Sequence, residues 1–374
     1  MRYDVIVVGA GPAGCAAAYD LVAAGKRVLL IDRRRFPREK PCAGGITIKT
    51  VRRLRYSIAP VVRQVCTDLV IGNGLHTSTT FRSAHATCVM TVRSEFDDFC
   101  LQRTLERGAE LETVPHIHSI VETADGVTVD TTNGAFEAAH LVGADGANSV
   151  VRRFMPALGR IAHGFAIEAI VRTATPPSMA FDFGVVDFGY GWLFPKRDHV
   201  NVGLYTNSGS TRPGRAALAE YAAAKLGTAR LEHVVGHHIG LEGWKHSHAT
   251  ARIALAGDAA GLVDPLLGEG IHNAVASGQA AAAAIVIALA SRTELAPIYR
   301  HQLRPVLNDL RACYNDAIRF YRNLDFGYRV LTTRIVRSAL MSGYARGLTF
   351  SQTKRRSLLL PLLPFQPGAA LQSH

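Results

Sequence analysis

The stretch YDVIVVGAGPAGCAAAYDLVAAGKRVLLIDR, residues 3–33, decides the fold of this chain. An apolar run leads into a glycine turn, an alanine-rich segment of helical character follows, and a second apolar run ends at Asp32. This order predicts a βαβ unit, in which a crossover helix joins two parallel strands. The expected fold class is therefore α/β.

The glycine spacing in that turn indicates a dinucleotide site. Gly9 allows the tight turn, Gly11 lets the backbone approach a pyrophosphate, and Gly14 lets helix and strand pack closely. Ala13 belongs to the same turn, at the start of a helix whose unpaired amides and positive dipole end face the phosphates. A glycine-rich turn without a ligand is the alternative, since GxGxxG alone is weak.

Asp32 strengthens the prediction because it lies 18 residues after Gly14, at the end of the second strand. There its carboxylate would accept hydrogen bonds from ribose hydroxyls, and its charge would repel the extra phosphate of an NADP. Arg33, the next residue, is counted with the same predicted site.

Size and composition describe a globular chain. It has 374 residues, of which 48% are hydrophobic and 19% charged, which fits one large composite domain or two intertwined ones. The net charge of +12 is concentrated at residues 292–374, where 13 Lys or Arg stand against 4 Asp or Glu. Such a region could meet nucleic acid, an anionic membrane or a phosphorylated substrate. No signature of a DNA- or RNA-binding module accompanies it, so we do not expect nucleic acid.

The sequence predicts a cytoplasmic protein. None of its six cysteines forms a CxxC pair, and the N-terminus has the pattern of a strand rather than a signal peptide. The longest apolar run has eleven residues, at 280–290, whereas a membrane-crossing helix needs about 20. Lys354, Arg355 and Arg356 precede leucines interrupted by Pro361 and Pro364. This segment either rests on the inner face of a membrane, as a peripheral contact, or packs back on its own domain.

Three further segments have patterns that would allow them to contact one extended cofactor. Residues 92–111 have helical apolar spacing after Arg93, for which a solvated cation at a helix start is the alternative. Residues 141–153, LVGADGANSVVRR, carry Asp145 after an apolar strand. Residues 251–278 place Gly257 and Asp258 at the end of a strand, where an acid can bind a polyol. Amides from Gly268 through Gly270 to Ile271, at a helix start, can stabilise negative charge.

The stretch FGYGWLFPK, residues 188–196, gathers four aromatic rings in a chain that is only 7% aromatic. Its pattern predicts bulky rings on both sides of a strand, with something flat and apolar against them. Core packing is the alternative. The histidines between His233 and His248 have no ligand set at metal spacing, so we expect no metal and assign them to solvated strands.

Taken together, these segments resemble the geranylgeranyl reductase family of FAD-dependent flavoproteins, which share the aromatic hydroxylase fold, over residues 1 to about 290. KPCAGG, residues 40–45, resembles the family's cysteine–glycine motif beside the flavin ring. YGWLFPK, residues 190–196, resembles its YxWxFPK motif, which lines the cavity for an isoprenoid tail.

The resemblance implies roles for individual residues. FAD would be bound by Gly9, Gly11, Ala13, Gly14, Asp32, Arg33, Cys42, Ala43, Gly44, Arg93, Asp145, Gly257, Asp258, Gly268, Gly270 and Ile271. Tyr190, Trp192 and Phe194 would be cavity walls, and the first two are counted with Cys42 as catalytic. Cys42 would donate a proton or tune the ring; a small buried filler is its alternative. Lys196 would contact the head group of the substrate or end its strand in water.

The expected architecture is a Rossmann-type FAD domain, from residues 1–60, 92–155 and 250–290, interleaved with an antiparallel-sheet substrate domain, from 61–91 and 156–249. A basic helical region, 291–374, would follow. The resemblance implies a reductase that saturates double bonds of an isoprenoid chain on a lipid, quinone or related compound. The alternatives are an aromatic or polyketide monooxygenase using NAD(P)H and oxygen, and a membrane-surface flavoprotein that binds a prenyl lipid without turnover. NAD(P)H or a ferredoxin-like carrier would supply electrons, since no second GxGxxG is present.

Overall fold

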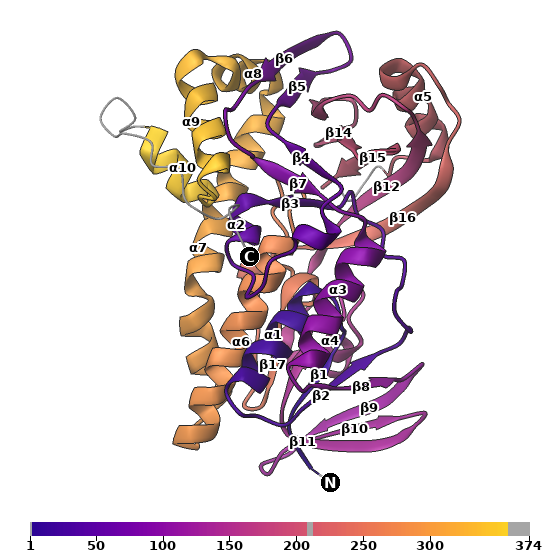
Figure 1. Ribbon diagram of the computed structural model, residues 1–374. Coiled ribbons are helices and arrows are strands. Elements are labelled where there is room, and N and C mark those ends of the chain that lie inside the picture. Colours follow the sequence, from indigo (N-terminus) through magenta and orange to yellow (C-terminus); the bar gives the residue numbers. More distant parts are fainter. Residues whose placement is uncertain (1, 208–211, 358–374) are drawn as a thin grey trace. The chain divides into compact units, whose positions relative to one another are not determined.

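The computed structural model describes residues 2–207 and 212–357, which form two compact units that each draw on three segments of the chain. Unit 1 comprises Met1–Lys40, Ser94–His163 and His238–Arg311, and unit 2 comprises Pro41–Arg93, Gly164–His237 and Ala312–His374. Figure 1 shows the helices and strands of both units. Each unit has its own sheet.

The sheet of unit 1 has a parallel centre. β8 (Glu110–Thr113), β2 (Val28–Asp32), β1 (Tyr3–Val8), β11 (Gly134–Gly143) and β17 (Ile253–Leu255) follow one another and pair in parallel. β10 (Val127–Thr131) and β9 (Ile117–Glu122) add an antiparallel edge beside β11. Every residue of β2 is buried, as a central parallel strand requires. The predicted Rossmann-type α/β fold is confirmed.

Helices pack closely in unit 1. α1 (Pro12–Ala23) follows β1, with proline at its first position, where the missing N–H costs nothing. α6 (Ile271–Ser291) lies beside α1 so closely that a Cβ on Gly278 would stand 2.2 Å from the carbonyl oxygen of Ala13 (Figure 1). α3 (Arg93–Glu106), α4 (Val150–Phe154) and the short helices η2 (Pro156–Leu158), η3 (Gly243–Lys245) and η4 (Gly257–Ala260) complete the connections.

α6 is the one helix among the described residues that is long and apolar enough to cross a bilayer. Within its most apolar window, 61% is buried inside the protein. A helix at the centre of a core has the same length and composition, so this property is weak support for a membrane span.

The sheet of unit 2 has the order β16 (Glu232–Leu241), β12 (Ala162–Arg172), β15 (His199–Thr206), β14 (Gly189–Pro195), β13 (Met179–Phe183), β5 (Leu69–Asn73) and β6 (Thr77–Phe81). From β12 to β6 the pairs are antiparallel, except that β5 and β13 run parallel. One face of this sheet is covered by α5 (Arg215–Leu226), whose Leu218 and Tyr221 join a buried cluster with Leu193 and Val202.

A second, small sheet explains why the unit boundaries differ from the expected ones. β7 (Cys88–Met90) pairs with both β3 (Gly45–Thr47) and β4 (Gln64–Cys66). These pairings tie the segment after residue 40, with α2 (Ile48–Val51) and η1 (Ala59–Val61), to unit 2. The expected boundary at residue 60 had grouped this segment with the nucleotide domain.

The rings of β14 lie on one face of the sheet, so the expectation of bulky rings on both sides is wrong. Tyr190, Trp192 and Phe194 occur at every second position, and successive side chains of a strand point to opposite faces. The alternate face carries Gly191 and Leu193, which pack against α5: a Cβ on Gly191 would be 2.4 Å from the Tyr221 ring. Phe188 precedes the strand.

The predicted C-terminal helical region is confirmed. It contains α7 (Leu295–Arg322), α8 (Leu324–Thr332), α9 (Arg334–Ala345) and α10 (Phe350–Ser357). α7 begins in unit 1, and the helices after it belong to unit 2. Pro361 and Pro364, with the leucine segment around them, lie outside the described residues.

Candidate functional site

The glycine turn of unit 1 is shaped as its spacing predicts. Gly9 has a φ of +100°, and a Cβ there would stand 2.4 Å from the carbonyl oxygen of Ala144. A Cβ on Gly14 would be 1.8 Å from the carbonyl oxygen of Gly9, so helix and turn touch backbone to backbone. At Gly11, in contrast, the nearest heavy atom to a Cβ is Nη2 of Arg38, at 3.5 Å. The turn therefore leaves an open cradle at Gly11.

Asp32 is held rigidly at the end of β2. Its Oδ2 accepts a hydrogen bond from Ala10 N at 2.9 Å, and its Oδ1 accepts one from Arg34 N at 3.0 Å. The residue is 7% exposed, so its carboxylate has little freedom beside the turn. Arg33, next to it, is exposed, and its part in cofactor binding stays a prediction.

Arg38 is a candidate cofactor residue that the sequence analysis missed. Its Nη1 lies 3.4 Å from Asp97 Oδ2 and its Nε lies 3.8 Å from Asp32 Oδ2. The Nε is buried and has no hydrogen-bond partner among the described residues. A buried cation with an unused donor beside an open glycine turn suits a pyrophosphate, so these residues fit a dinucleotide. In sequence, Arg38 sits in the charged run RRRFPREK, which is typical of a solvated loop.

The GADG segment contributes backbone to the same turn. The Cα of Asp145 would be 2.9 Å from a Cβ on Gly9. The carboxylate of Asp145 accepts hydrogen bonds from Ser149 Oγ at 2.6 Å and from the Val150 and Val151 amides at 2.5 and 3.2 Å. Burial raises the pKa of this carboxyl, and those hydrogen bonds oppose the rise. Its side chain therefore caps α4, and a direct role toward a cofactor stays a prediction.

The third predicted segment also reaches the start of α1. A Cβ on Gly257 would be 3.2 Å from the Cβ of Ala13, and one on Gly270 would be 3.3 Å from Oδ1 of Asp258. Gly268 has a φ of +64°, and Ile271 begins α6, so its amides lie at a helix N-terminus. Unit 1 thus brings together the glycine turn, Asp32, the backbone of Asp145 and the segment from Gly257 to Ile271.

Arg93 and the remaining predicted residues lie in unit 2. Arg93 is the first residue of α3 and is only 8% exposed, so the interpretation as a solvated cation is wrong. Burial raises the pKa of Glu168, a buried carboxyl of β12 that sequence reasoning did not single out, and the charge of Arg93 opposes that rise. A single acid inside the apolar strand FAIEAIV was the signal that could have found it.

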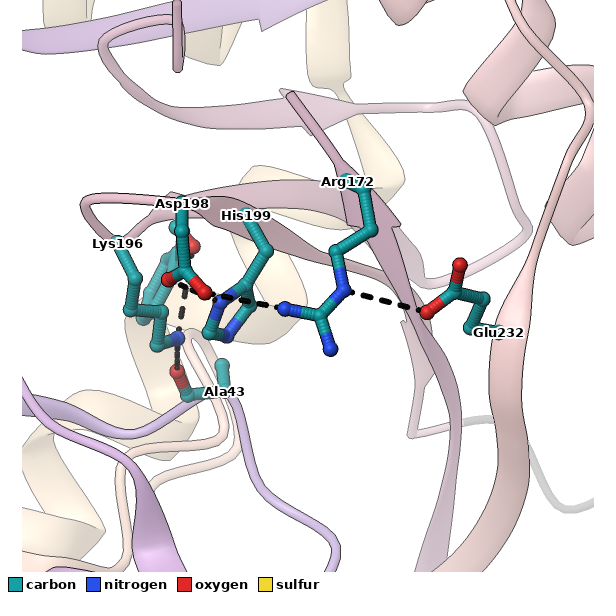
Figure 2. A network of polar contacts seen from close by, with 7 residues as sticks. Ala43, Arg172, Lys196, Asp198, His199 and Glu232 are labelled. Carbon is teal, nitrogen blue, oxygen red and sulfur yellow. Dashed lines mark hydrogen bonds and ion pairs between the residues drawn. The ribbon is translucent and has the colours of Figure 1, made fainter. Parts of the chain in front are cut away.

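Two buried charged side chains hold the loop of residues 42–45, which we call the CAGG loop. Cys42 N donates to Glu168 Oε1 at 2.9 Å. Figure 2 shows the second of these bonds, in which Lys196 Nζ donates to the carbonyl oxygen of Ala43 at 2.6 Å. Gly44 has a φ of +75°, and its carbonyl accepts hydrogen bonds from Thr91 N and Oγ1 at 2.8 and 2.9 Å. Backbone atoms of three consecutive residues, Cys42, Ala43 and Gly44, are therefore held by hydrogen bonds within unit 2.

The electrostatics of this loop depend on burial. Lys196 is 3% exposed, and burial lowers its pKa to about 8, although the charge of Glu168 raises it. Burial raises the pKa of Glu168, whereas hydrogen bonds from Cys42 N and the Asn201 side chain lower it. Glu168 Oε2 is buried with no hydrogen-bond partner in the described part of the chain. The alternative in which Lys196 ends its strand in water is wrong.

The turn after Lys196 is held by a separate polar network. Arg172 donates to Asp198 Oδ2 at 3.0 Å and to Glu232 Oε2 at 3.3 Å, and His199 Nδ1 lies 2.8 Å from Asp198 Oδ1 (Figure 2). Arg172, Asp198 and Glu232 are solvent-accessible, so this network adds little stability by itself. It fixes the connection from β14 to β15.

The aromatic face of unit 2 adjoins the CAGG loop. The ring of Phe181 lies edge-on to those of Tyr190 and Phe194, at centroid distances of 5.2 and 5.4 Å. Trp192 donates its Nε1–H to Asn201 Oδ1 at 2.7 Å. A Cβ on Gly45 would be 2.6 Å from the Phe194 ring, so only glycine lets the loop lie against this ring. The structure thus brings the predicted substrate-binding residues together with Cys42, Ala43 and Gly44.

Cys42 differs from the other five cysteines. It is half-buried, whereas Cys15, Cys66, Cys88, Cys100 and Cys313 are buried. A half-exposed thiol in a fixed loop does not fill a core, which favours a functional role over the filler alternative.

The histidines between residues 233 and 248 do not all face solvent. His233 is exposed, but His248 is 7% exposed, and burial lowers its pKa to about 4. The interpretation as solvated strand residues is therefore wrong for His248. No group of three or more His, Cys, Asp or Glu side chains in residues 2–207 and 212–357 is arranged to hold a metal ion.

Comparison with known proteins identifies the family. Residues 2–180 match the family model for the FAD binding domain. A geranylgeranyl diphosphate reductase of Rhodobacter capsulatus is 31% identical over 322 residues, which cover 78% of this chain and 77% of the relative. A menaquinone reductase of Mycolicibacterium smegmatis is 32% identical over 75% of this chain and 76% of the relative. An uncharacterized protein of Methanosarcina barkeri is 32% identical over 94% of this chain and 92% of its own length.

Solved structures agree on the fold. A geranylgeranyl bacteriochlorophyll reductase-like protein of Thermoplasma acidophilum superimposes with a TM-score of 0.80 at 20% identity, over 96% of this chain and 99% of that one. The flavin-dependent brominase Bmp2 follows with 0.73 at 17% identity, over 96% and 99%. At such identities the likeness concerns the fold alone. The sequence relatives go further: the chain is an FAD-dependent oxidoreductase and belongs to the geranylgeranyl reductase family.

Proposed function

We propose that this enzyme saturates double bonds of an isoprenoid chain, of the geranylgeranyl type, carried by a lipid, a quinone or a related compound. The observation that carries the proposal is the contact between Gly45 of the CAGG loop and the Phe194 ring of the aromatic face. An apolar chain without polar groups is bound by burial against flat side chains, at about 25 cal/mol per Å² of apolar surface. The names of relatives at 31% and 32% identity support the same substrate class.

FAD, once bound and reduced, supplies a hydride. In our proposal unit 1 holds it through the open cradle at Gly11, the carboxylate of Asp32 and the unused Nε of Arg38. The amides at the start of α6, from Gly268 to Ile271, favour negative charge at that position. Arg33 and Asp145 are assigned to the same site as in the family.

The alkene also needs a proton, because the hydride adds a hydrogen to only one of the two alkene carbons and the other carbon must be protonated. We assign the donation of this proton to the Sγ–H of Cys42. Water then reprotonates the thiolate that is left. Glu168 and Lys196 act as positioning residues, since each binds a peptide group of the loop that carries Cys42. Tyr190 and Trp192 orient the chain and exclude water, and Phe194 supports the loop. Lys196 is 3% exposed and its Nζ donates to the carbonyl oxygen of Ala43, so in this proposal it positions the loop rather than binding the substrate's head group.

The electron donor in this proposal is NADPH, NADH or a ferredoxin-like carrier that binds transiently. We also propose a cytoplasmic enzyme in peripheral contact with the inner face of a membrane. Its support is the basic composition of the C-terminal region and the water-insoluble nature of a prenyl lipid. Lys354, Arg355 and Arg356 are among its basic residues and lie on α10.

The test compares substrates under controlled oxygen. The purified, FAD-loaded enzyme is supplied in turn with NADPH, NADH or reduced ferredoxin, without oxygen, in the presence of prenylated lipids and quinones. We expect one donor to support turnover that yields chains two hydrogens heavier per double bond. Oxygen consumption stimulated by an aromatic compound, without any saturated prenyl product, would support the monooxygenase alternative instead. Binding of a prenyl lipid without turnover under every donor would support the non-catalytic alternative.

A further inference from the structure

Large apolar side chains are exposed at the C-terminal helices of unit 2. Phe326 and Val330, four residues apart on α8, are 69% and 42% exposed, and Ile335, near the start of α9, is 69% exposed. The opposite side of α8 carries Tyr328, which is 7% exposed and whose hydroxyl lies 2.9 Å from Thr79 Oγ1. The helix is therefore anchored by one face and presents large apolar side chains to its surroundings beside the exposed Asp325 and Arg329.

Two strand turns of the same unit adjoin these helices and are apolar as well. Leu75, between β5 and β6, and Phe188, before β14, are each 43% exposed. Asn73 Nδ2 donates to Asp325 Oδ1 at 2.8 Å, which ties the β5–β6 turn to α8 (Figure 1). The Phe188 ring lies 6.2 Å from that of Tyr321, at the end of α7.

The charges around this region are mostly positive. Residues 319–356 contain nine Lys or Arg and a single acid, Asp325, which accepts the hydrogen bond from Asn73. Arg329 and Arg334 are exposed on α8 and α9, and no acidic side chain in the described part of the chain pairs with either. Unpaired guanidinium groups therefore alternate with exposed apolar side chains over residues 326–335.

We propose that this surface, formed by Phe326, Arg329, Val330, Arg334 and Ile335 with Leu75 and Phe188 beside it, docks on an anionic lipid bilayer. The apolar side chains would enter the boundary between head groups and acyl chains, and the arginines would bind lipid phosphates. Charge complementarity selects this partner, because an apolar surface bordered mainly by cations, with Asp187 and Asp325 as the exposed acids next to its phenylalanines, suits phosphate head groups above a hydrocarbon layer. The inference concerns a surface outside the reaction and stands whether or not the proposed substrate is correct.

The experiment measures sedimentation of the full-length, FAD-loaded protein with vesicles. One set contains phosphatidylglycerol in phosphatidylcholine, and the other is phosphatidylcholine alone. We expect binding to the anionic set that weakens as salt is added, because screening reduces the arginine contribution. The double variant Phe326→Ser/Ile335→Ser should bind about tenfold more weakly, and Arg329→Glu/Arg334→Glu should lose the preference for anionic vesicles. Val121→Ser, at a 51% exposed position of β9 in unit 1, is the matched control and should bind like the wild type.

Retained FAD content and circular dichroism identify the folded variants, and exposed positions are expected to tolerate the changes. Wild-type protein that binds neither set of vesicles contradicts the proposal. So does a folded Phe326→Ser/Ile335→Ser variant that binds as tightly as the wild type. If Leu358→Ser/Leu359→Ser/Leu360→Ser abolishes binding while the double variant keeps it, the C-terminal segment is the membrane contact and the proposed surface is not.

Discussion

The ammonium of Lys196 donates a hydrogen bond to the carbonyl oxygen of Ala43 across 2.6 Å, although the two residues lie 153 positions apart in the chain. Lys196 ends the aromatic motif, and Ala43 lies inside the CAGG loop. Glu168 holds the amide of Cys42 next to it at 2.9 Å. The two motifs that carry the family resemblance are thus joined within unit 2 by the charged hydrogen bond from Lys196 to Ala43, and charged hydrogen bonds are the stronger kind.

Removing this ammonium tests its role in positioning the loop. Lys196→Met leaves the carbonyl of Ala43 without its buried donor, which should lower the free energy of unfolding by about 1–3 kcal/mol. Turnover should fall by more than FAD affinity does, because unit 2 and not unit 1 is changed. Urea unfolding and flavin fluorescence measure the two effects. Lys245→Met, which breaks the accessible pair with Glu242, is the control and should change neither.

The same lysine predicts a pH dependence of stability. Its folded-state pKa of about 8 lies below the ordinary value of 10.5, so between these values the unfolded chain binds more protons than the folded one. Burial of the charged form therefore costs free energy below pH 8, and this cost is relieved as pH rises toward 10.5. The unfolding free energy of the wild type should rise relative to that of Lys196→Met over this window. Parallel curves for the two proteins in urea titrations would contradict the assignment.

Loss of the Glu168 side chain should release Cys42. In Glu168→Ala the amide of Cys42 has no partner, the loop loosens, and iodoacetamide should label Cys42 about tenfold faster. The other five cysteines are buried and should stay unlabelled, which peptide mass mapping resolves. Glu242→Ala is the control. An unchanged labelling rate in Glu168→Ala would show that Glu168 does not position this residue.

The open cradle at Gly11 predicts that a substitution there weakens FAD binding without lowering the stability of the fold. Gly11→Ala introduces a methyl group whose nearest neighbour is 3.5 Å away, so the protein should fold normally. That methyl occupies the approach of the pyrophosphate and should weaken FAD binding at least about tenfold. Gly214→Ala is the control for the loss of a glycine, because Gly214 is the N-cap of α5, has a negative φ like that of Gly11, and has no heavy atom within 4 Å of a Cβ. Equal FAD content in both purified variants would place the phosphates elsewhere.

Arg38 allows an independent check of the same site. Arg38→Met removes the donor beside the turn and should also reduce FAD affinity about tenfold, since charge-assisted hydrogen bonds to phosphate are strong. Arg34→Met is the matched control, because the side chain of Arg34 is exposed and reaches only the carbonyl of Glu39, at 3.4 Å. Fluorescence titration of the flavin-free proteins with FAD compares the two. Similar affinities would remove Arg38 from the site.

The features of the site that the sequence predicted correctly are those that depend on residues close together in the chain. The turn from Gly9 to Gly14 and the acid at Asp32 belong to one βαβ unit, so their spacing alone indicates their structure. Residues whose role depends on distant partners were missed. Arg38 looks like part of a solvated basic run, and Glu168 pairs with Cys42 across 126 positions.

The aromatic motif carries a periodicity that indicates on which face of the strand its rings lie. Tyr190, Trp192 and Phe194 follow the two-residue period of a strand, which already places them on one face. Lys196 continues that period, but a lysine at a strand end is ordinarily solvated, and its buried bond to Ala43 depends on a loop that no local pattern connects to it.

The most direct measurement of the central claim is a single turnover without oxygen. The bound flavin is reduced with two electrons per flavin and mixed with a geranylgeranyl compound, while absorbance follows the flavin and mass spectrometry follows the lipid. Our account predicts that the oxidised flavin spectrum returns as one saturated bond forms per flavin, and that Cys42→Ala slows this step. A flavin that stays reduced beside bound and unchanged geranylgeranyl chains would contradict the account.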